Sequence, residues 1–154
     1  MVDAGAKRAF RLSVAVWVVL LCGGSGSFGA IDYAHTYLRI AAPVDQARFR
    51  FDDNLAALGS NPSKAQLRKI AMPLAGAIRA LDPKLIDSPW PPRVEPVIRS
   101  LVRADRNLLQ ALDSGAQHRR LPSSRWEWAI IDNTGVVNSA DSMVHARLGL
   151  PPPY

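Results

Sequence analysis

The chain is short of cysteine, glutamate and histidine, and each shortage excludes a class of protein. Its single cysteine, Cys22, excludes an intrachain disulfide, so stability must come from packing. Neither of its two glutamates, Glu95 and Glu127, is followed three residues later by histidine, which excludes the Glu-x-x-His pairs of a di-iron bundle. The three histidines stand far apart, without the spacing of metal ligands: His35, His118 and His145. We therefore expect no metal and no cofactor.

Motifs that carry catalysis are also missing. There is no Gly-x-Ser-x-Gly elbow for a serine hydrolase and no Cys-x-x-Cys-His for covalent haem. The glycine-rich stretch 23–29 follows no predicted strand and precedes no Gly-Lys-Ser, so it does not form a phosphate loop. We expect no catalytic residues and predict that the protein is not an enzyme.

Only one long apolar run is present, and it lies near the N-terminus. Lys7, Arg8 and Arg11 precede the run Val14–Cys22, and the small residues 23–27 follow it, which is the layout of an export signal. About 20 residues are needed to cross a bilayer as a helix, so this shorter run favours a cleavable signal over a permanent anchor. We assign residues 1–30 to a signal peptide or membrane anchor with a Gly/Ser tether, and 31–154 to one domain.

The position of Cys22 leaves a second form of attachment open. A lipoprotein carries its acylated cysteine at the end of such a run, and Gly23 is acceptable after it. Leu21 disagrees with this reading, because the residue before a lipidated cysteine should be small. Either way, we expect an extracytoplasmic protein that is membrane-associated through its N-terminal segment or secreted.

The charge of the chain narrows the choice of partner. Its net charge is +6 and its pI about 10.1, which in a cytoplasmic protein would suggest nucleic acid. The export segment argues against nucleic acid. Anionic lipid, a cell-wall polymer or an envelope protein is the more sensible partner.

Four amphipathic segments predict an all-α, up-down four-helix bundle. Apolar residues recur at steps of three and four over about 32–58, 63–82, 93–115 and 124–148. Strand-like alternation is scarce. The expected core residues are Tyr37, Ala41, Val44, Phe51, Leu55, Leu58, Leu67, Ile70, Leu74, Ile78, Leu81, Val97, Leu101, Ala104, Leu108, Leu112, Trp126, Ile130, Val137, Ala140 and Val144.

Prolines, glycines and serines mark where these helices bend, begin and end. Pro43 and Pro73 predict kinks, and the four prolines of 82–92 predict a stiff connector around Trp90. Ser63 with Gln66, and Ser124 with Glu127, match the capping box that opens a helix. Gly115 and Gly149 suit the C-terminal caps of the last two helices.

Two charged residues fall on or beside the predicted inner faces. Arg48 fills the one polar slot in the first apolar stripe, and Asp105 adjoins Ala104 in the third. A buried charge needs a partner to offset the loss of hydration. We therefore predict a partly buried pair between Arg48 and Asp105 that fixes the register of two helices.

The end of the chain resembles that of a known group of proteins. The run Val144–Pro153, with Trp90-Pro91 in the connector and Ala104-Asp105-Arg106 in the third helix, is similar to uncharacterised exported or lipoprotein-like helical proteins of actinobacteria. His145 and Arg147 stand where that group usually has arginine and aspartate. The resemblance implies an exported helical fold and supplies no activity.

Two functions remain as hypotheses. The first is a non-enzymatic extracytoplasmic interaction module or envelope-associated module. The second is a small-molecule carrier that holds an apolar ligand in the bundle core; its proposed contacts are Tyr37, Phe51, Trp90 and Trp126. A closed core favours the first, whereas a core cavity of a few hundred cubic ångströms favours the second.

Overall fold

The computed structural model describes residues 28–58, 62–117 and 123–153, and over these ranges its regular secondary structure is all helix. The four helices are α1 (Phe28–Ala57), α2 (Lys64–Asp87), α3 (Glu95–Gln117) and α4 (Ser123–Leu148). The predicted all-α, four-helix architecture is therefore confirmed. The proposed export segment as far as residue 27, with Cys22, lies outside the described residues, whereas the proposed mature N-termini from Phe28 to Ile31 fall at the start of α1.

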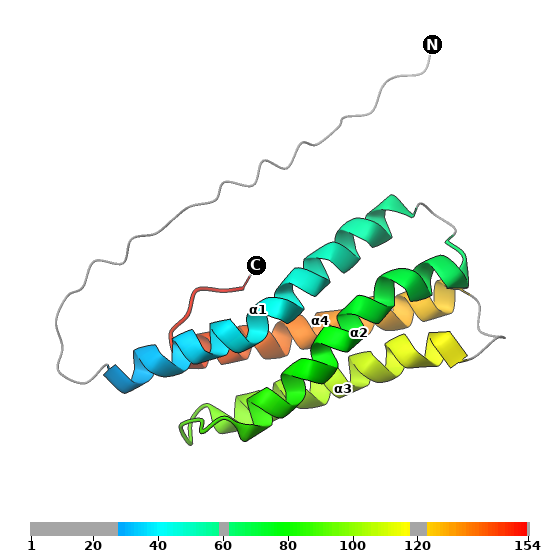
Figure 1. Ribbon diagram of the computed structural model, residues 1–154. Helices are drawn as coiled ribbons and strands as arrows, with labels where there is room; N and C mark the ends of the chain where they lie inside the picture. Colours follow the sequence, from blue (N-terminus) through cyan, green and yellow to red (C-terminus); the bar gives the residue numbers. More distant parts are fainter. Residues whose placement is uncertain (1–27, 59–61, 118–122, 154) are drawn as a thin grey trace, which may run out of the picture.

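The helices pack in sequence order, each running opposite to the one before it (Figure 1). α3 and α4 make the most extensive contact, whereas the backbones of α1 and α4 approach each other at few points. Short connections force such antiparallel neighbours, as in up-down bundles. The bundle is therefore closed unevenly, with α1–α4 as its loosest seam.

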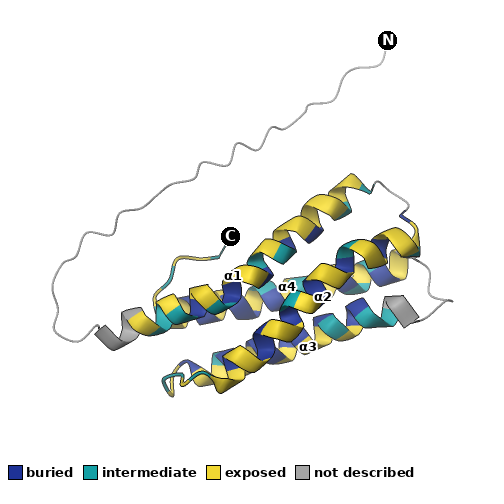
Figure 2. Cartoon of the chain, in the orientation of Figure 1, coloured by how far each residue is buried: buried dark blue, intermediate teal, exposed yellow. Residues whose placement is uncertain are grey.

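The core consists of the residues that helical periodicity selects. Figure 2 shows buried residues on the faces that the helices turn toward one another, with exposed residues outside. Of the expected core residues, four are only partly buried and pack against the rest: Leu55, Leu58, Ile70 and Val97. All the others are buried. Apolar spacing alone thus identified the inward face of every helix.

Three prolines lie inside helices without ending them. Pro43 is within α1 and Pro73 and Pro83 are within α2, and all three are exposed. A proline on the solvent side is tolerated because the helix can curve away from its ring; α1 changes direction part-way along (Figure 1). The predicted end of the second helix at Pro83 was wrong, because α2 continues to Asp87 and buries Leu85.

The predicted first capping box is present. Ser63 is the N-cap of α2: its hydroxyl accepts from the Gln66 amide at 3.3 Å, and its own amide donates to Gln66 Oε1 at 2.9 Å. The second predicted box was wrong, because α4 begins at Ser123 and Ser124 is already inside it. The predicted and observed starts of α4 differ by one residue, which is within the usual uncertainty of helix ends.

The two predicted glycine caps have different outcomes. Gly115 lies within α3, which continues to Gln117, so its assignment as a cap was wrong. Gly149 does end α4, with a φ of 71°. The Leu150 amide donates to the His145 carbonyl at 2.9 Å and the Gly149 amide to Ala146 at 3.4 Å, which is a Schellman motif. The tail then turns back along the bundle (Figure 1).

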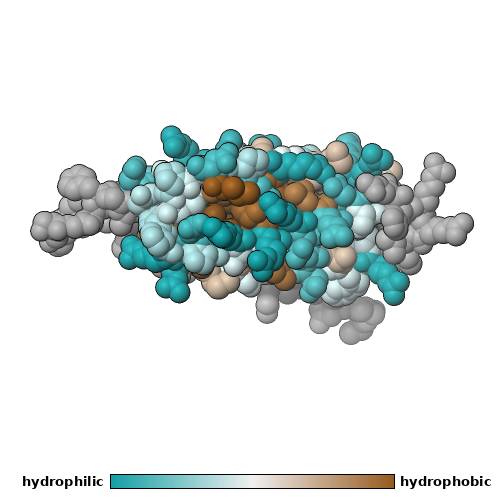
Figure 3. All heavy atoms as spheres, turned by 90° about the horizontal axis from the view of Figure 1, so that it is seen from below, coloured by the Kyte–Doolittle hydropathy of each residue, from teal (hydrophilic) through white to brown (hydrophobic). Residues whose placement is uncertain are grey.

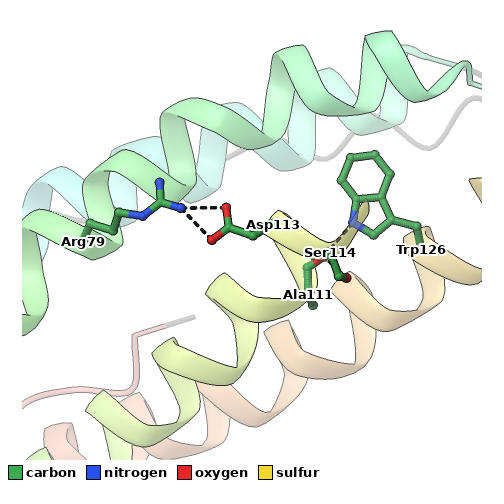
Figure 4. Close-up of polar contacts among 5 residues, drawn as sticks. All are labelled: Arg79, Ala111, Asp113, Ser114 and Trp126. Carbon is green, nitrogen blue, oxygen red and sulfur yellow. Dashed lines mark hydrogen bonds and ion pairs between the residues drawn. The ribbon is translucent and has the colours of Figure 1, made fainter. Parts of the chain in front are cut away.

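Polar contacts on α3 hold the bundle on both sides (Figure 4). Arg79 of α2 donates to both carboxylate oxygens of Asp113, at 2.6 and 2.7 Å. The buried indole of Trp126 donates to the Ala111 carbonyl at 2.7 Å, so that α4 is joined to α3 by a directed bond. A buried indole N–H needs such a partner.

The surface is mixed in character. The face shown in Figure 3 has apolar surface in its middle, bordered and crossed by hydrophilic side chains. Among the helices of the described residues, none combines the length and the apolar content that membrane crossing requires.

Candidate functional site

A polar cluster lies in the seam between α1 and α4. The buried Tyr37 hydroxyl of α1 donates to Oδ1 of Asp141 on α4. His145, one turn further along α4, places Nε2 3.8 Å from the same oxygen. Its Nδ1 lies 2.5 Å from the Pro151 carbonyl, and because a carbonyl only accepts, Nδ1 carries the proton. The cluster thus joins α1, α4 and the C-terminal tail.

Tyr37 acts in this cluster as a hydrogen-bond donor only. Burial, and then the neighbouring Asp141 carboxylate, raise the pKa of Tyr37 far above its usual value. The phenol therefore stays protonated at physiological pH and cannot serve as a base. Its ring packs edge-on against His145 and Trp90, with centroids 5.6 and 6.3 Å away.

Arg48 and Asp105 are both buried, but they do not form the predicted ion pair. Arg48 donates through Nη1 to Asn138 of α4 at 3.0 Å. Neither carboxylate oxygen of Asp105 has a hydrogen-bond partner among the described residues, and the side chain is 0% exposed. Both residues line one small cavity, so the fold brings them together without bonding them directly.

The electrostatics of Asp105 follow from this position. Burial, followed by the nearby Asp82 and Asp141 carboxylates, raises the pKa of Asp105 to about 7, and the Arg48 guanidinium acts in the opposite direction. Uncharged below that pH, the carboxyl avoids the large desolvation cost of a buried anion. Charge at Asp105 is therefore linked to the stability of the bundle.

The cavity around the buried polar residues is too small to hold a substrate or an apolar ligand. The cavity lined by Tyr37, Arg48 and Asp105 has a volume of about 10 Å³, enough for one water molecule. Phe51 and Trp126, two other proposed walls of a carrier site, are 3% and 2% exposed in the packed core. Among the described residues, no three His, Cys, Asp or Glu side chains are arranged to hold a metal ion.

A much larger recess lies on the surface, where α2 ends and α3 begins. It has a volume of about 570 Å³. Its apolar lining includes Trp90 of the connector, with the almost fully buried Leu85 of α2 and Ile98 and Val102 of α3 beneath it. Its rim carries three arginines of α3: Arg99, Arg103 and Arg106. We call this recess the arginine groove.

Trp90 ties the connector to the end of α2 and to α1. Its indole N–H donates to the Leu85 carbonyl at 2.6 Å, which satisfies a backbone acceptor in the last turn of α2. Its ring contacts Tyr33 and Tyr37 of α1. Of the four contacts predicted for a core ligand, Trp90 is the one that lines this recess, and it faces a surface site rather than the bundle interior.

The three arginines differ in their pairing. Arg99 pairs with Glu95 one turn earlier, and the Nε of Arg106 lies 3.9 Å from the Asp82 carboxylate. Arg103, between them, makes no ion pair with any described residue. The groove is therefore net positive. Sequence reasoning missed it: arginines at steps of four and three share one helix face, but this spacing does not reveal the neighbouring elements that form the groove.

A shallower recess of about 210 Å³ lies between α3 and α4. Ala104 and Ala140 contribute to it, and the half-exposed Val136 and Met143 stand at its edge. Trp128, also on α4, is 69% exposed. This face is less polar than the arginine groove and carries fewer directed groups.

No protein-family model, curated protein or solved structure matches this chain.

Proposed function

We propose that this protein is a non-enzymatic interaction module of the cell envelope, located outside the cytoplasm and either held at the membrane by its N-terminal segment or released from it. The observation that carries the proposal is the contrast between the interior and the surface. The core cavity holds about 10 Å³, whereas the arginine groove offers about 570 Å³. This contrast favours a binding site on the surface over one in the interior.

The chemistry of the buried cluster supports binding over catalysis. A general base must reach a substrate proton within hydrogen-bond distance. Tyr37 is protonated, and Asp105 is closed off from solvent in a cavity the size of one water. The Tyr37 hydroxyl joins α1 to α4 through Asp141, and neither Tyr37 nor Asp105 has room to act on a bound molecule.

The carrier hypothesis requires a ligand site at the surface of the protein in place of the predicted site in the bundle core. Small-molecule sites usually occupy about 300–1,000 Å³. The arginine groove lies within this range, whereas the core cavity does not. A carrier function would therefore use the groove and Trp90, and would leave Tyr37, Phe51 and Trp126 as packing residues.

The direct test of the proposal is the location of the domain. A reporter that works only outside the cytoplasm, fused after Tyr154, should be active in intact cells, because positive charge preceding the apolar run keeps the N-terminus inside. The same reporter without residues 1–27 is the matched control and should be inactive. Activity of a cytoplasmic reporter on the full chain would contradict the proposal.

The form of attachment needs a second measurement. Mass spectrometry of the exported chain should show a new N-terminus between about Ser27 and Ile31 if the signal is cleaved. A diacyl mass on Cys22, abolished by Cys22→Ser, would identify a lipoprotein instead. An intact Met1 or Val2 start would identify a retained anchor.

A further inference from the structure

We propose that two copies of this protein associate through the outer face of α4, with their α4 helices antiparallel about a two-fold axis. This face consists of Asp132, Val136, Ser139, Met143 and Arg147, all of them exposed. Its occupant is a second copy of the chain. The inference goes beyond the proposed function, since it gives the module a second binding surface besides the arginine groove.

The exposed side of α4 carries apolar side chains where a solvated helix carries polar ones. Four of the eight large apolar side chains that are exposed among the described residues lie on this helix: Trp128, Ile131, Val136 and Met143, at 69%, 45%, 50% and 50%. A helix that borders water normally turns its polar residues outward. Exposed apolar side chains that gather on one element mark a contact surface.

The residues of this face have the same spacing in both directions along the helix. Steps of four, seven and four residues lead from Asp132 through Val136 and Met143 to Arg147, and such steps stay on one helix face. Across a two-fold axis, a contact of one residue with another is repeated with the two copies exchanged. An antiparallel pair therefore places each Val136 against Met143 of the second copy, and each Asp132 against Arg147.

The charges of this face complement those of a second copy. Neither Asp132 nor Arg147 forms an ion pair with another described residue of its own chain. In the antiparallel arrangement each carboxylate meets a guanidinium, which can bind it through two parallel hydrogen bonds. A parallel arrangement in register would place like charges opposite one another at both ends. The charges therefore favour the antiparallel dimer.

The middle of the face is suited to close contact between two helices. Ser139 and Ala140 lie nearest to the two-fold axis, and both have small side chains. The Ser139 hydroxyl already donates to the Gly135 carbonyl at 3.0 Å, so its donor keeps a partner when water is excluded.

The recess of about 210 Å³ between α3 and α4 adjoins this face and offers space for side chains of the second copy. Ala104 and Ala140 contribute to its lining, and Met143 stands at its edge. Arg103 lines both this recess and the arginine groove, so its guanidinium can stay in water when the recess is covered.

The first test measures self-association of the full-length chain by sedimentation equilibrium. One helix pair is a small interface, so the dimer should be weak and depend on concentration. Asp132→Arg and Arg147→Asp should each raise its dissociation constant about tenfold or more, because each places like charges opposite one another twice. The double variant restores both pairs and should return the constant to within about threefold of the native value.

Controls separate this contact from other effects of charge. Asp53→Arg and Arg68→Asp reverse exposed charges of α1 and α2 and should leave the dissociation constant unchanged. All variants keep the N-terminal segment, so differences between them report on the described helices. At concentrations well below the dissociation constant the chain is a monomer, and unfolding measured there does not depend on Asp132 or Arg147 pairing.

The second test locates the axis by disulfide formation between copies in the Cys22→Ser chain, which has no other thiol. Ser139→Cys places a thiol beside the axis and should form a disulfide-linked dimer under mild oxidation. Trp128→Cys places an equally accessible thiol about 17 Å along the helix from the axis, so its two copies lie too far apart to react. A parallel pair would cross-link at both positions.

The proposal is overturned if the native chain stays monomeric up to about 1 mM, or if the double charge variant fails to restore association. It is also overturned if Trp128→Cys cross-links as readily as Ser139→Cys. An active exported reporter on a chain that stays monomeric would refute this inference and leave the proposed function standing. A cytoplasmic reporter on a chain whose charge variants behave as expected would have the opposite meaning.

Discussion

Replacing Asp105 with asparagine should make the bundle more stable at alkaline pH and leave it almost unchanged in acid. Asp105 is 0% exposed, and neither of its oxygens has a hydrogen-bond partner among the described residues. Asparagine has the same shape and carries no charge at any pH. Its amide N–H groups can donate to nearby carboxylates, such as those of Asp82 and Asp141, which couple to Asp105.

The magnitude follows from the raised pKa. The pKa of Asp105 rises from 3.8 to about 7 in the folded state, a difference of about 3 that corresponds, at 1.36 kcal/mol per pH unit, to about 4 kcal/mol. Between these two values the native state holds a proton that the unfolded state has released. Stability of the native chain therefore falls as pH rises from about 4 to about 7, and it levels off above.

Urea unfolding of both chains at pH 4.5, 6 and 8, followed by circular dichroism, measures this difference. Asp105→Asn should exceed the native chain by up to about 4 kcal/mol at pH 8, and by far less at pH 4.5. Some slope should persist in the variant, because burial also raises the pKa of Asp82. The exposed Asp132→Asn is the control and should stay within about 0.5 kcal/mol of the native chain. A difference between Asp105→Asn and the native chain that is the same at all three pH values would refute the reasoning.

Three further changes test the packing and the helix ends by the same unfolding assay. Trp126→Ala should destabilise the chain by about 3–5 kcal/mol, because it removes a buried ring and its bond to Ala111; a loss below about 0.5 kcal/mol would show that the ring is exposed. Ser63→Ala should cost about 1 kcal/mol through the lost cap of α2, and Ser63→Gly clearly less. Gly149→Ala should cost about 1 kcal/mol: its φ of 71° disfavours a side chain, although no atom lies within 4 Å of the added Cβ. Equal stability of this variant would mean that the end of α4 rearranges.

Most of the fold could be predicted because helical spacing reports burial directly. In α1, Tyr37, Ala41 and Val44 recur at steps that place them on one face, and all are buried. The positions of helix ends were harder to predict. Pro83 should end a helix, yet the burial of Leu81 and Leu85 on either side of it holds α2 together. Tertiary packing thus outweighed a local signal.

The arginine groove could not be predicted from the apolar pattern, because it depends on two helices and a connector meeting. Arg99, Arg103 and Arg106 read in sequence as a solvated helix face. They line a groove only because the fold places the end of α2 and Trp90 beside them. Helix periodicity gives the direction of a side chain and says nothing of its neighbours from other elements.

The same limit explains the partner of Arg48. The stripe of α1 correctly predicted that Arg48 points inward, and the need to compensate a buried charge suggested Asp105. The guanidinium instead reaches Asn138 on α4, at 3.0 Å. The backbones of α1 and α4 approach at few points, and polar side chains bridge the distance between the two helices. Arg48 donates to Asn138 and Tyr37 donates to Asp141, so the buried polar residues that most suggest an active site join α1 to α4.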